Sequence, residues 1–275
     1  MSKTNQGGIN PRVLRLTEGA VMLALATVLS LVKLIDLPYG GSVTAASAVP
    51  LVLLSFRHGV GFGTFAGLAY GLLQLAFSSS LSYVTGFWSV AAVLVLDFIV
   101  AFAAVGLGGA FRRVKNQPIA LACGAVLYGV VRYVLHVISG ATVWAGISIP
   151  TAAALIYSFG YNATYMIPET IIAAAGAYFL GSVLDFRGDM PSRRAVSHTR
   201  GAGWLTALTV GAPVAAVVYD VAVIFPHVQD PETGEFTFAS LPNVNWTTVC
   251  IVTGIGILIA VVAACMARAK KQKES

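Results

Sequence analysis

Charged side chains are scarce in this sequence of 275 residues, in which Asp, Glu, Lys and Arg together make up only 10%. An ordinary soluble domain contains about 25% of them. Hydrophobic residues account for 57%, and the mean hydropathy is +0.81. This composition excludes a water-soluble globular protein. Because a membrane-crossing helix needs about 20 apolar residues, the chain has room for about eight such helices and for no separate soluble domain.

Several motifs that would indicate an enzyme or a metalloprotein are also missing. The sequence has no GxxxxGK(S/T) motif for ATP, no HExxH motif and no cluster of Cys and His that would bind zinc. Its three cysteines, Cys123, Cys250 and Cys265, all lie in apolar runs, which argues against a disulfide framework. The net charge of +6 comes from basic residues spread along the chain, unlike the basic face of a nucleic-acid-binding protein. We therefore expect no cofactor, no metal and no nucleic-acid partner.

The apolar residues fall into runs that predict an all-α membrane protein with eight transmembrane helices. The runs lie at about residues 18–37, 42–56, 59–77, 84–110, 118–140, 150–184, 204–225 and 246–267. The second run is short and contains Pro50, so a tilted, broken or re-entrant segment is expected there. A polar stretch at 187–203 predicts a cytoplasmic linker between a six-helix domain, residues 1–186, and an additional two-helix hairpin with a basic tail, residues 204–275.

Lysine and arginine are concentrated in alternate loops, which predicts the orientation in the membrane. They precede the first run, separate the second from the third and the fourth from the fifth, and follow the sixth and the eighth. The loops near 78–86 and 141–149 carry no charge. The positive-inside rule then places both termini in the cytoplasm and the uncharged loops outside.

Four ionisable residues within the apolar runs are candidate functional residues, because a charge inside the membrane is costly: Asp97, Arg132, His136 and Glu169. Arg132 and His136 are four residues apart and share one face of a helix. Asp97 and Arg132 could simply neutralise each other, and His136 could be an ordinary buried histidine. Glu169 is interpreted as a hydrogen-bonding or pairing residue with no assigned chemistry.

Aromatic and amide side chains accompany these charges toward the outer side of the membrane. Trp144 follows His136 along the chain, and Tyr157 and Asn162 lie in the outer half of the next helix. Trp144 and Tyr157 could instead belong to an interfacial aromatic belt. Taken together, the set predicts an outward-facing pocket for a small aromatic cation. The carboxylate would balance its charge, the flat side chains would stack on its rings, and the amide and phenol would orient it by hydrogen bonds.

Two other classes of function remain open at this point. Asp97, His136 and Glu169 could serve as acid and base groups of a membrane-embedded enzyme. A scaffold or assembly subunit would instead fill the pocket with its own side chains. In the first run, Ala20, Ala24 and Thr27 form a stripe of small residues, which either packs within the protein or docks a partner membrane protein.

The first 185 or so residues resemble the thiamine-specific substrate-binding component of energy-coupling factor vitamin transporters. The resemblance rests on residues 132–136 (RYVLH) with Ser139, Gly140 and Trp144, on Tyr157-Ser158, Tyr161-Asn162 and Tyr165-Met166, and on the stretches 49–53 (VPLVL) and 57–59 (RHG). It implies a six-helix protein in the plasma membrane of a bacterium that captures thiamine from outside. The implied partners are a transmembrane coupling protein and two cytoplasmic ATPase subunits.

The resemblance also assigns roles to individual residues. His136 matches the histidine that contacts the thiazolium ring, Trp144 the tryptophan that stacks on the pyrimidine, and Tyr157 and Asn162 the pair that hydrogen-bonds the pyrimidine. Arg132 stands where the family has a basic residue, and Tyr39 is the candidate for an aromatic of the first outer loop. Asp97 replaces the usual glutamate, which leaves a thiamine precursor or another cationic heterocycle as an alternative ligand. Ala20 and Ala24 match the alanine motif that docks on the coupling protein.

Overall fold

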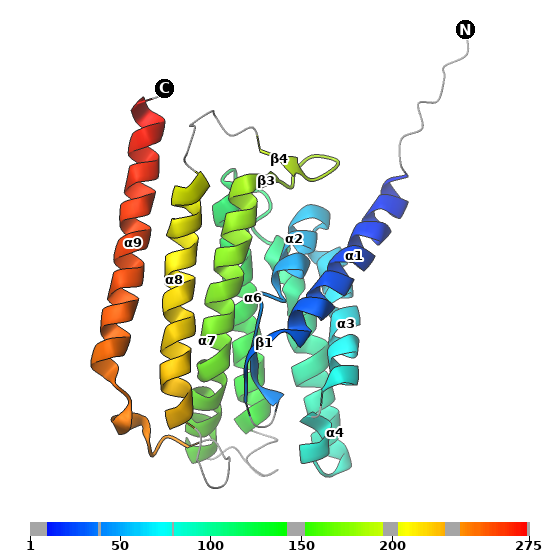
Figure 1. The fold of residues 1–275 in the computed structure, drawn as a ribbon. Helices are drawn as coiled ribbons and strands as arrows, with labels where there is room; N and C mark the ends of the chain where they lie inside the picture. Colours follow the sequence, from blue (N-terminus) through cyan, green and yellow to red (C-terminus); the bar gives the residue numbers. More distant parts are fainter. Residues whose placement is uncertain are drawn as a thin grey trace.

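The computed structural model describes residues 10–37, 40–78, 80–141, 152–194, 203–228 and 237–273. Within these residues, seven helical segments are long and apolar enough to cross a membrane. Six are the helices α1 (Pro11–Leu31), α3 (Val60–Phe77), α6 (Gln117–Ser139), α7 (Ala152–Val183), α8 (Gly203–Ile224) and α9 (Trp246–Lys273). The seventh joins α4 (Phe87–Val93), the π-helix η3 (Leu94–Val100), α5 (Ala101–Ala103) and the 3₁₀ helix η4 (Ala104–Gly109). The expectation of an all-α membrane protein is confirmed (Figure 1).

Of the eight expected membrane helices, the one at 42–56 is broken, which is one of the outcomes expected for that run. That run contains strand β2 (Ser42–Thr44) and helix α2 (Val49–His58), and α2 has only 10 residues. At 1.5 Å per residue, α2 is about 15 Å long, half the thickness of the hydrocarbon layer. The end of the first run is not helical either, because Lys33–Asp36 forms strand β1, which pairs with β2 in antiparallel register.

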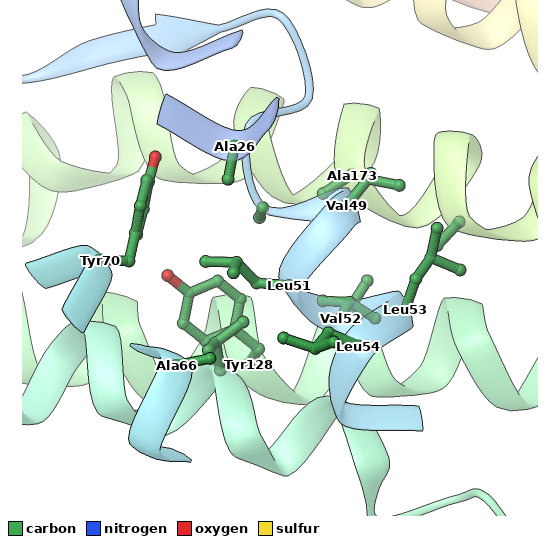
Figure 2. Close-up of a cluster of buried hydrophobic side chains, with 14 of the residues drawn as sticks. Ala26, Val49, Leu51, Val52, Leu53, Leu54, Ala66, Tyr70, Tyr128 and Ala173 are labelled. Carbon is green, nitrogen blue, oxygen red and sulfur yellow. The ribbon is translucent and has the colours of Figure 1, made fainter. Parts of the chain in front are cut away.

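Helix α2 is short because it lies inside the protein rather than against lipid. Every side chain from Val49 to Phe56 is buried, and the helix packs against α1, α3, α6 and η4. Figure 2 shows its leucines and valines between Ala26 of α1, Tyr70 of α3 and Tyr128 of α6. Non-helical backbone at membrane depth is tolerated only where protein covers it or where it lines a cavity. The β1–β2 hairpin beside α2 meets this condition, since its residues line the cavity described below.

Three glycines of α3 let the fourth membrane segment approach closely. Gly63, Gly67 and Gly71 repeat every four residues and lie on one face of the helix. A Cβ atom at Gly67 or Gly71 would collide with the carbonyl oxygen of Phe102 or Phe98. Small residues at this spacing are typical of close helix packing in membranes. The contact fixes the backbone that directly follows Asp97, the residue at the centre of the π-helical turn.

The end of the bundle where α1 begins and α9 ends brings together the basic loops of the sequence. There Arg57 pairs with Glu18 of α1 at 2.7 Å and donates hydrogen bonds to the backbone carbonyls of Phe186, Gly188 and Asp189. The last three belong to the segment that contains strands β3 (Leu184–Asp185) and β4 (Ser192–Arg193). Loops far apart in the sequence thus meet at one end, as the charge pattern predicts (Figure 1).

The C-terminal hairpin continues the bundle as an added layer. Helix α8 packs on α7, and α9 packs on α8 at the edge of the molecule (Figure 1). The hydroxyl group of Thr253 on α9 donates a hydrogen bond to the carboxylate of Asp220 on α8. Between the two helices lie the 3₁₀ turns η6 (Phe225–His227) and η7 (Leu241–Asn243), at the end of the bundle opposite β3 and β4. Near the same end, the turn η2 (Ser80–Tyr83) precedes α4.

Candidate functional site

A cavity of about 490 Å³ lies between the β1–β2 hairpin and helices α3, α6 and α7. Its volume falls within the usual range for small-molecule sites, about 300–1,000 Å³. Five of the predicted site residues line it: Asp97, Arg132, His136, Tyr157 and Asn162. Trp144 and Tyr39, the other two, lie outside the described residues. An open cavity is also inconsistent with the interpretation of the chain as a scaffold whose pocket is filled with side chains.

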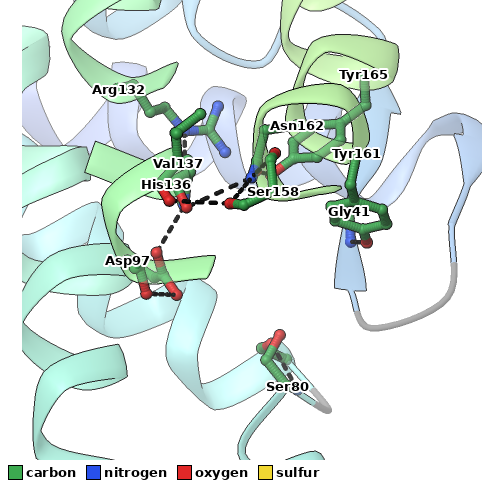
Figure 3. A network of polar contacts seen from close by, with 12 residues as sticks. Gly41, Ser80, Asp97, Arg132, His136, Val137, Ser158, Tyr161, Asn162 and Tyr165 are labelled. Atoms are coloured by element: carbon green, nitrogen blue, oxygen red, sulfur yellow. Dashed lines mark hydrogen bonds and ion pairs between the residues drawn. The ribbon is translucent and has the colours of Figure 1, made fainter. Parts of the chain in front are cut away.

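A chain of hydrogen bonds joins the charged groups across the cavity (Figure 3). The Nδ1 atom of His136 lies 2.8 Å from Oδ1 of Asp97, and Nε of Arg132 donates to Nε2 of His136 at 3.2 Å. On its other side, Nη1 of Arg132 lies 3.3 Å from Oε2 of Glu169. All four side chains are at least 87% buried, with 6–13% of their surface exposed. The polar groups of three membrane segments therefore form one connected network.

The network fixes the tautomer of His136. A guanidinium group can only donate hydrogen bonds, so the Nε2 atom that faces Arg132 must carry a lone pair. The proton then resides on Nδ1, which donates to the carboxylate of Asp97. His136 is accordingly neutral. Both of its ring nitrogens are engaged by protein groups, which leaves the faces of the imidazole for contact with a ligand.

The charges of this network do not cancel. Asp97 and Glu169 contribute two carboxylates, whereas Arg132 contributes one guanidinium group, and His136 is neutral. Lys33 also lines the cavity, but it pairs with Asp36 at 2.9 Å in an exposed position. With both carboxylates ionised, the formal charge of the buried part of the site is therefore −1, which a monovalent cation would balance.

Each carboxylate is held by a hydroxyl group as well as by its partner in the chain of hydrogen bonds. Ser139 donates to Oδ2 of Asp97 at 2.8 Å, and Thr44 of β2 donates to Oε1 of Glu169 at 2.8 Å. The guanidinium group of Arg132 stacks on the ring of Phe102, with its Cζ atom 4.7 Å from the ring centroid. A carboxylate oxygen has room for a further hydrogen bond beyond these. These contacts hold both carboxylates and the guanidinium group in place.

On α7, an amide and a phenol form a second polar network beside the first. The side chain of Asn162 donates to the backbone carbonyl of Ser158 at 2.8 Å, and Tyr165 donates to its Oδ1 atom at 2.6 Å. The rings of Tyr157 and Tyr161 are parallel, with centroids 6.4 Å apart. The hydroxyl oxygen of Tyr161 accepts a hydrogen bond from the backbone N–H of Gly41, at the tip of the β1–β2 hairpin (Figure 3). The hairpin is thereby tied to the aromatic side of the site.

The structure also changes the pairing suggested by the sequence. Asp97 and Arg132 are not direct partners: the ion pair of Arg132 is with Glu169, and Asp97 contacts His136. Glu169 is a pairing residue as expected, yet it also lines the cavity, which sequence analysis did not foresee. Ser139 and Thr44 were missed as well. Spacing could have indicated Ser139, which follows His136 by three residues on one helical face, but nothing local connects Thr44 with a residue 125 positions away.

Comparisons with known proteins agree with this architecture. Residues 16–185 match the family described as Thiamine transporter protein (Thia_YuaJ). The thiamine transporter ThiT of Bacillus subtilis (strain 168) is 38% identical over 175 residues, which cover 59% of this chain and 88% of that protein. A solved structure of ThiT from Listeria monocytogenes has the same fold, with a TM-score of 0.51 at 22% identity over 62% of this chain and 95% of that one. The chain belongs to the thiamine transporter protein family.

Proposed function

We propose that this protein binds thiamine in the cavity between α3, α6, α7 and the β1–β2 hairpin, as the substrate-binding component of an energy-coupling factor transporter. The observation that carries the proposal is the buried chain Asp97–His136–Arg132–Glu169, which leaves one net negative charge facing the cavity. Thiamine is a monovalent cation built of two flat rings, so it matches both the charge and the aromatic lining. Membership of the thiamine transporter family supports the same ligand.

The proposed roles follow from where each group lies. Asp97 and Glu169 balance the charge of the thiazolium ring, and the imidazole face of His136 contacts that ring. The neutral tautomer suits this role, because a protonated imidazole would repel the cation. Tyr157 and Asn162 contact the pyrimidine, the first by its ring and the second by its amide. For Trp144 and Tyr39, the roles of stacking on the pyrimidine and covering the thiazolium rest on the family resemblance alone.

The charge distribution supports an orientation with both termini in the cytoplasm. Arg15, Arg57, Arg112 and Arg187 gather at the end of the bundle where α1 begins. The cavity lining includes Ser78 and Ser80 of the uncharged loop at the opposite end. The positive-inside rule assigns the basic end to the cytoplasm, so the cavity faces outward. Labelling by a membrane-impermeant maleimide should then reach a cysteine at Ser82 but not one at Arg113 in intact cells.

Transport requires a partner that hydrolyses ATP, and the exposed face of α1 is the proposed docking site. Ala20 and Ala24 are both exposed, so they do not pack against other helices of this chain. Val21, Val28 and Leu31 beside them are also more than half exposed. A face of small and apolar side chains lets another helix approach closely. We propose that a transmembrane coupling protein with two cytoplasmic ATPase subunits binds there and drives release of thiamine inside.

Titration of the purified full-length protein with thiamine tests the binding function, with calorimetry as the measurement. We expect one site with stoichiometric, reversible binding. Asp97→Asn removes one buried negative charge and should weaken binding by at least about tenfold, or 1.4 kcal/mol. Asp189→Asn, which removes an exposed carboxylate at the opposite end of the bundle, is the matched control and should bind as the wild type does. Equal affinities for the two variants would refute the proposed site.

The same preparation distinguishes the alternatives. If the pyrimidine moiety alone displaced thiamine at equal concentration, a thiamine precursor would be the better ligand. If the purified chain converted thiamine to a product, the enzyme interpretation would replace that of a binding protein. The engagement of both ring nitrogens of His136 by protein groups favours binding over acid–base chemistry.

A further inference from the structure

The C-terminal hairpin has no part in the function proposed above, and it begins beyond residue 185, where the family match ends. Its two helices are joined near the outer end of the bundle by residues 225–228 and 237–245, which we call the outer elbow. The elbow contacts the outer half of α7, the helix that carries Tyr157, Ser158, Tyr161 and Asn162 of the cavity.

The first contact is a small hydrophobic core shared by three parts of the chain. Val228 of the elbow is 1% exposed and belongs to one cluster with Leu37 and Val43 of the β1–β2 hairpin and with Tyr165 and Met166 of α7. Ile224, Phe225 and Leu241 extend the cluster from the elbow side. Tyr165 is also the residue that donates a hydrogen bond to Asn162. The added hairpin therefore packs against Tyr165, which in turn holds the side chain of Asn162.

The second contact places an aromatic ring directly on α7. The tip of the Phe238 ring lies against Gly160, where any Cβ atom would collide with it. Gly160 is flanked along the helix by the stacked pair Tyr157 and Tyr161. Because Tyr161 accepts the hydrogen bond from Gly41, the same stretch of α7 is tied to the β1–β2 hairpin. Phe238 thus packs against one side of α7, and the other side of the same stretch of helix lines the cavity.

Hydrogen bonds fix the elbow itself, so it can restrict the movement of α7 and of the β1–β2 hairpin. The backbone N–H of Thr237 donates to the carbonyl of Val228 at 2.9 Å and joins the two parts of the elbow. The indole of Trp246 donates to the carbonyl of Leu241 at 3.2 Å. Below the elbow, Thr253 and Asp220 link α9 to α8. These bonds make the elbow and the two helices one unit behind the cavity.

We propose that the outer elbow supports the wall of the ligand cavity from behind, with Val228 and Phe238 as positioning residues that keep α7 and the β1–β2 hairpin together while the ligand is bound. The inference rests on the proposed function in so far as the ligand is thiamine. The Gly41–Tyr161 hydrogen bond joins the β1–β2 hairpin to α7 beside the cavity, and the elbow, which packs behind both, opposes the opening of this contact. Its effect is accordingly on the rate of dissociation, the step in which most differences of affinity between variants arise.

Phe238→Ala in the full-length protein tests the proposal, with Phe65→Ala as the matched control. Phe65 lies on α3 and is 65% exposed, so its removal deletes the same ring without a packing contact. We expect Phe238→Ala to speed thiamine dissociation by about fivefold in stopped-flow fluorescence while the association rate stays unchanged. Without ligand, residues 40–45 should exchange amide hydrogens faster in this variant. Gly160→Ala, which favours the helix but displaces the ring, should act in the same direction.

The two readouts separate failure of this proposal from failure of the proposed function. If the wild type does not bind thiamine, the binding proposal fails, and amide exchange at residues 40–45 alone decides the role of the elbow. If amide hydrogen exchange is unchanged in both Phe238→Ala and Gly160→Ala, the proposed role of the elbow is refuted. Faster amide exchange with an unaltered rate of thiamine dissociation would also refute it, because the elbow would then not help to retain the ligand. Equal changes in Phe65→Ala would show a general loosening of the bundle and overturn it as well.

Discussion

At the scale of single residues, His136 is the link on which the site depends. It is the only side chain that contacts both Asp97 and Arg132 among the hydrogen bonds of the described residues. Because Arg132 offers donors only, the imidazole must accept on one side and donate on the other. An amide could make the same two hydrogen bonds, but it would lack the aromatic ring that faces the cavity. The histidine therefore organises the charges in addition to its proposed contact with the ligand.

We expect His136→Ala to weaken thiamine binding by at least about tenfold, equal to 1.4 kcal/mol. The substitution removes a ring that faces the cavity and leaves Asp97 and Arg132 each without one partner. Fluorescence or calorimetric titration of the purified protein measures the effect. His58→Ala is the control, since this imidazole pairs with Glu18 at the opposite end of the bundle. A loss of affinity shared by both variants would contradict a specific role for His136.

Glu169 makes a different prediction, about stability. Glu169→Leu leaves the buried guanidinium group of Arg132 without its carboxylate partner, and breaking a buried ion pair in this way typically costs about 3–5 kcal/mol. We expect a clearly lowered midpoint of thermal unfolding in detergent. Glu169→Gln keeps an oxygen that can accept from Arg132 and Thr44, so its midpoint should lie between those of the leucine variant and the wild type. A leucine variant as stable as the wild type would show that the pair is not structural.

Sequence analysis could find the charged residues of the site but not their pairing. A charge within an apolar run stands out from the sequence alone, which is why Asp97, Arg132 and His136 were identified. The partner of each charge depends on the rotation and depth of its helix, which hydropathy does not specify. Glu169 was accordingly read as a pairing residue without a site, although it closes the network from α7.

At the scale of elements, the cavity depends on how closely α3 approaches the segment that carries Asp97. Seen from the sequence, α3 is an ordinary apolar helix, and its glycines reduce its helix propensity. In the folded protein the same glycines bring its backbone against Phe98 and Phe102. The π-helical turn at Leu94–Val100 lies at this contact, and such turns are frequent at functional sites.

Gly71→Ala and Gly61→Ala form a matched pair on α3. The first adds a methyl group where it would collide with the carbonyl oxygen of Phe98, and the second adds it where no atom lies within 4 Å. We expect Gly71→Ala to destabilise the protein by roughly 1–3 kcal/mol and to weaken thiamine binding, because the collision displaces the neighbour of Asp97. Gly61→Ala should be neutral or slightly stabilising. Thermal unfolding of both variants measures the difference, and equal midpoints would refute the close contact.

Helix α2 marks the limit of prediction at this scale. Apolar content alone suggests a further membrane span at 42–56, whereas the shortness of the run and Pro50 indicate a broken or re-entrant segment. The run is split because Ser42–Thr44 pairs with Lys33–Asp36, a contact between residues that hydropathy treats as parts of two spans. By contrast, the long runs at 118–140 and 150–184 are close to α6 and α7, since a span exposed to lipid on one side must be helical along its whole length.

At the scale of the whole molecule, one side of the bundle is covered by the C-terminal hairpin and the opposite side is exposed. The C-terminal hairpin covers α7 on one side of the bundle, and α1 forms the opposite edge (Figure 1). The sequence indicated the added hairpin by its polar linker, and the division into residues 1–186, 187–203 and 204–275 stays a prediction. Hydropathy does not indicate that α8 shares a hydrophobic cluster with Tyr165 beside the cavity, because the cluster joins residues far apart in the sequence.

The exposed edge at α1 yields a prediction that separates binding from transport. Ala24→Trp places a large side chain on the face proposed to dock the coupling protein, and Ala24 makes no buried contact within the chain. We expect thiamine uptake by cells to fall by at least about tenfold, because small residues are what permit close approach of a partner helix. Binding of thiamine to the purified protein should be unchanged. Ile255→Trp, on the exposed face of α9, controls for the bulk of the indole and should leave uptake intact. Normal uptake by the Ala24 variant would mean that the partner docks elsewhere. Loss of both uptake and thiamine binding would mean that α1 acts on the cavity rather than on a partner.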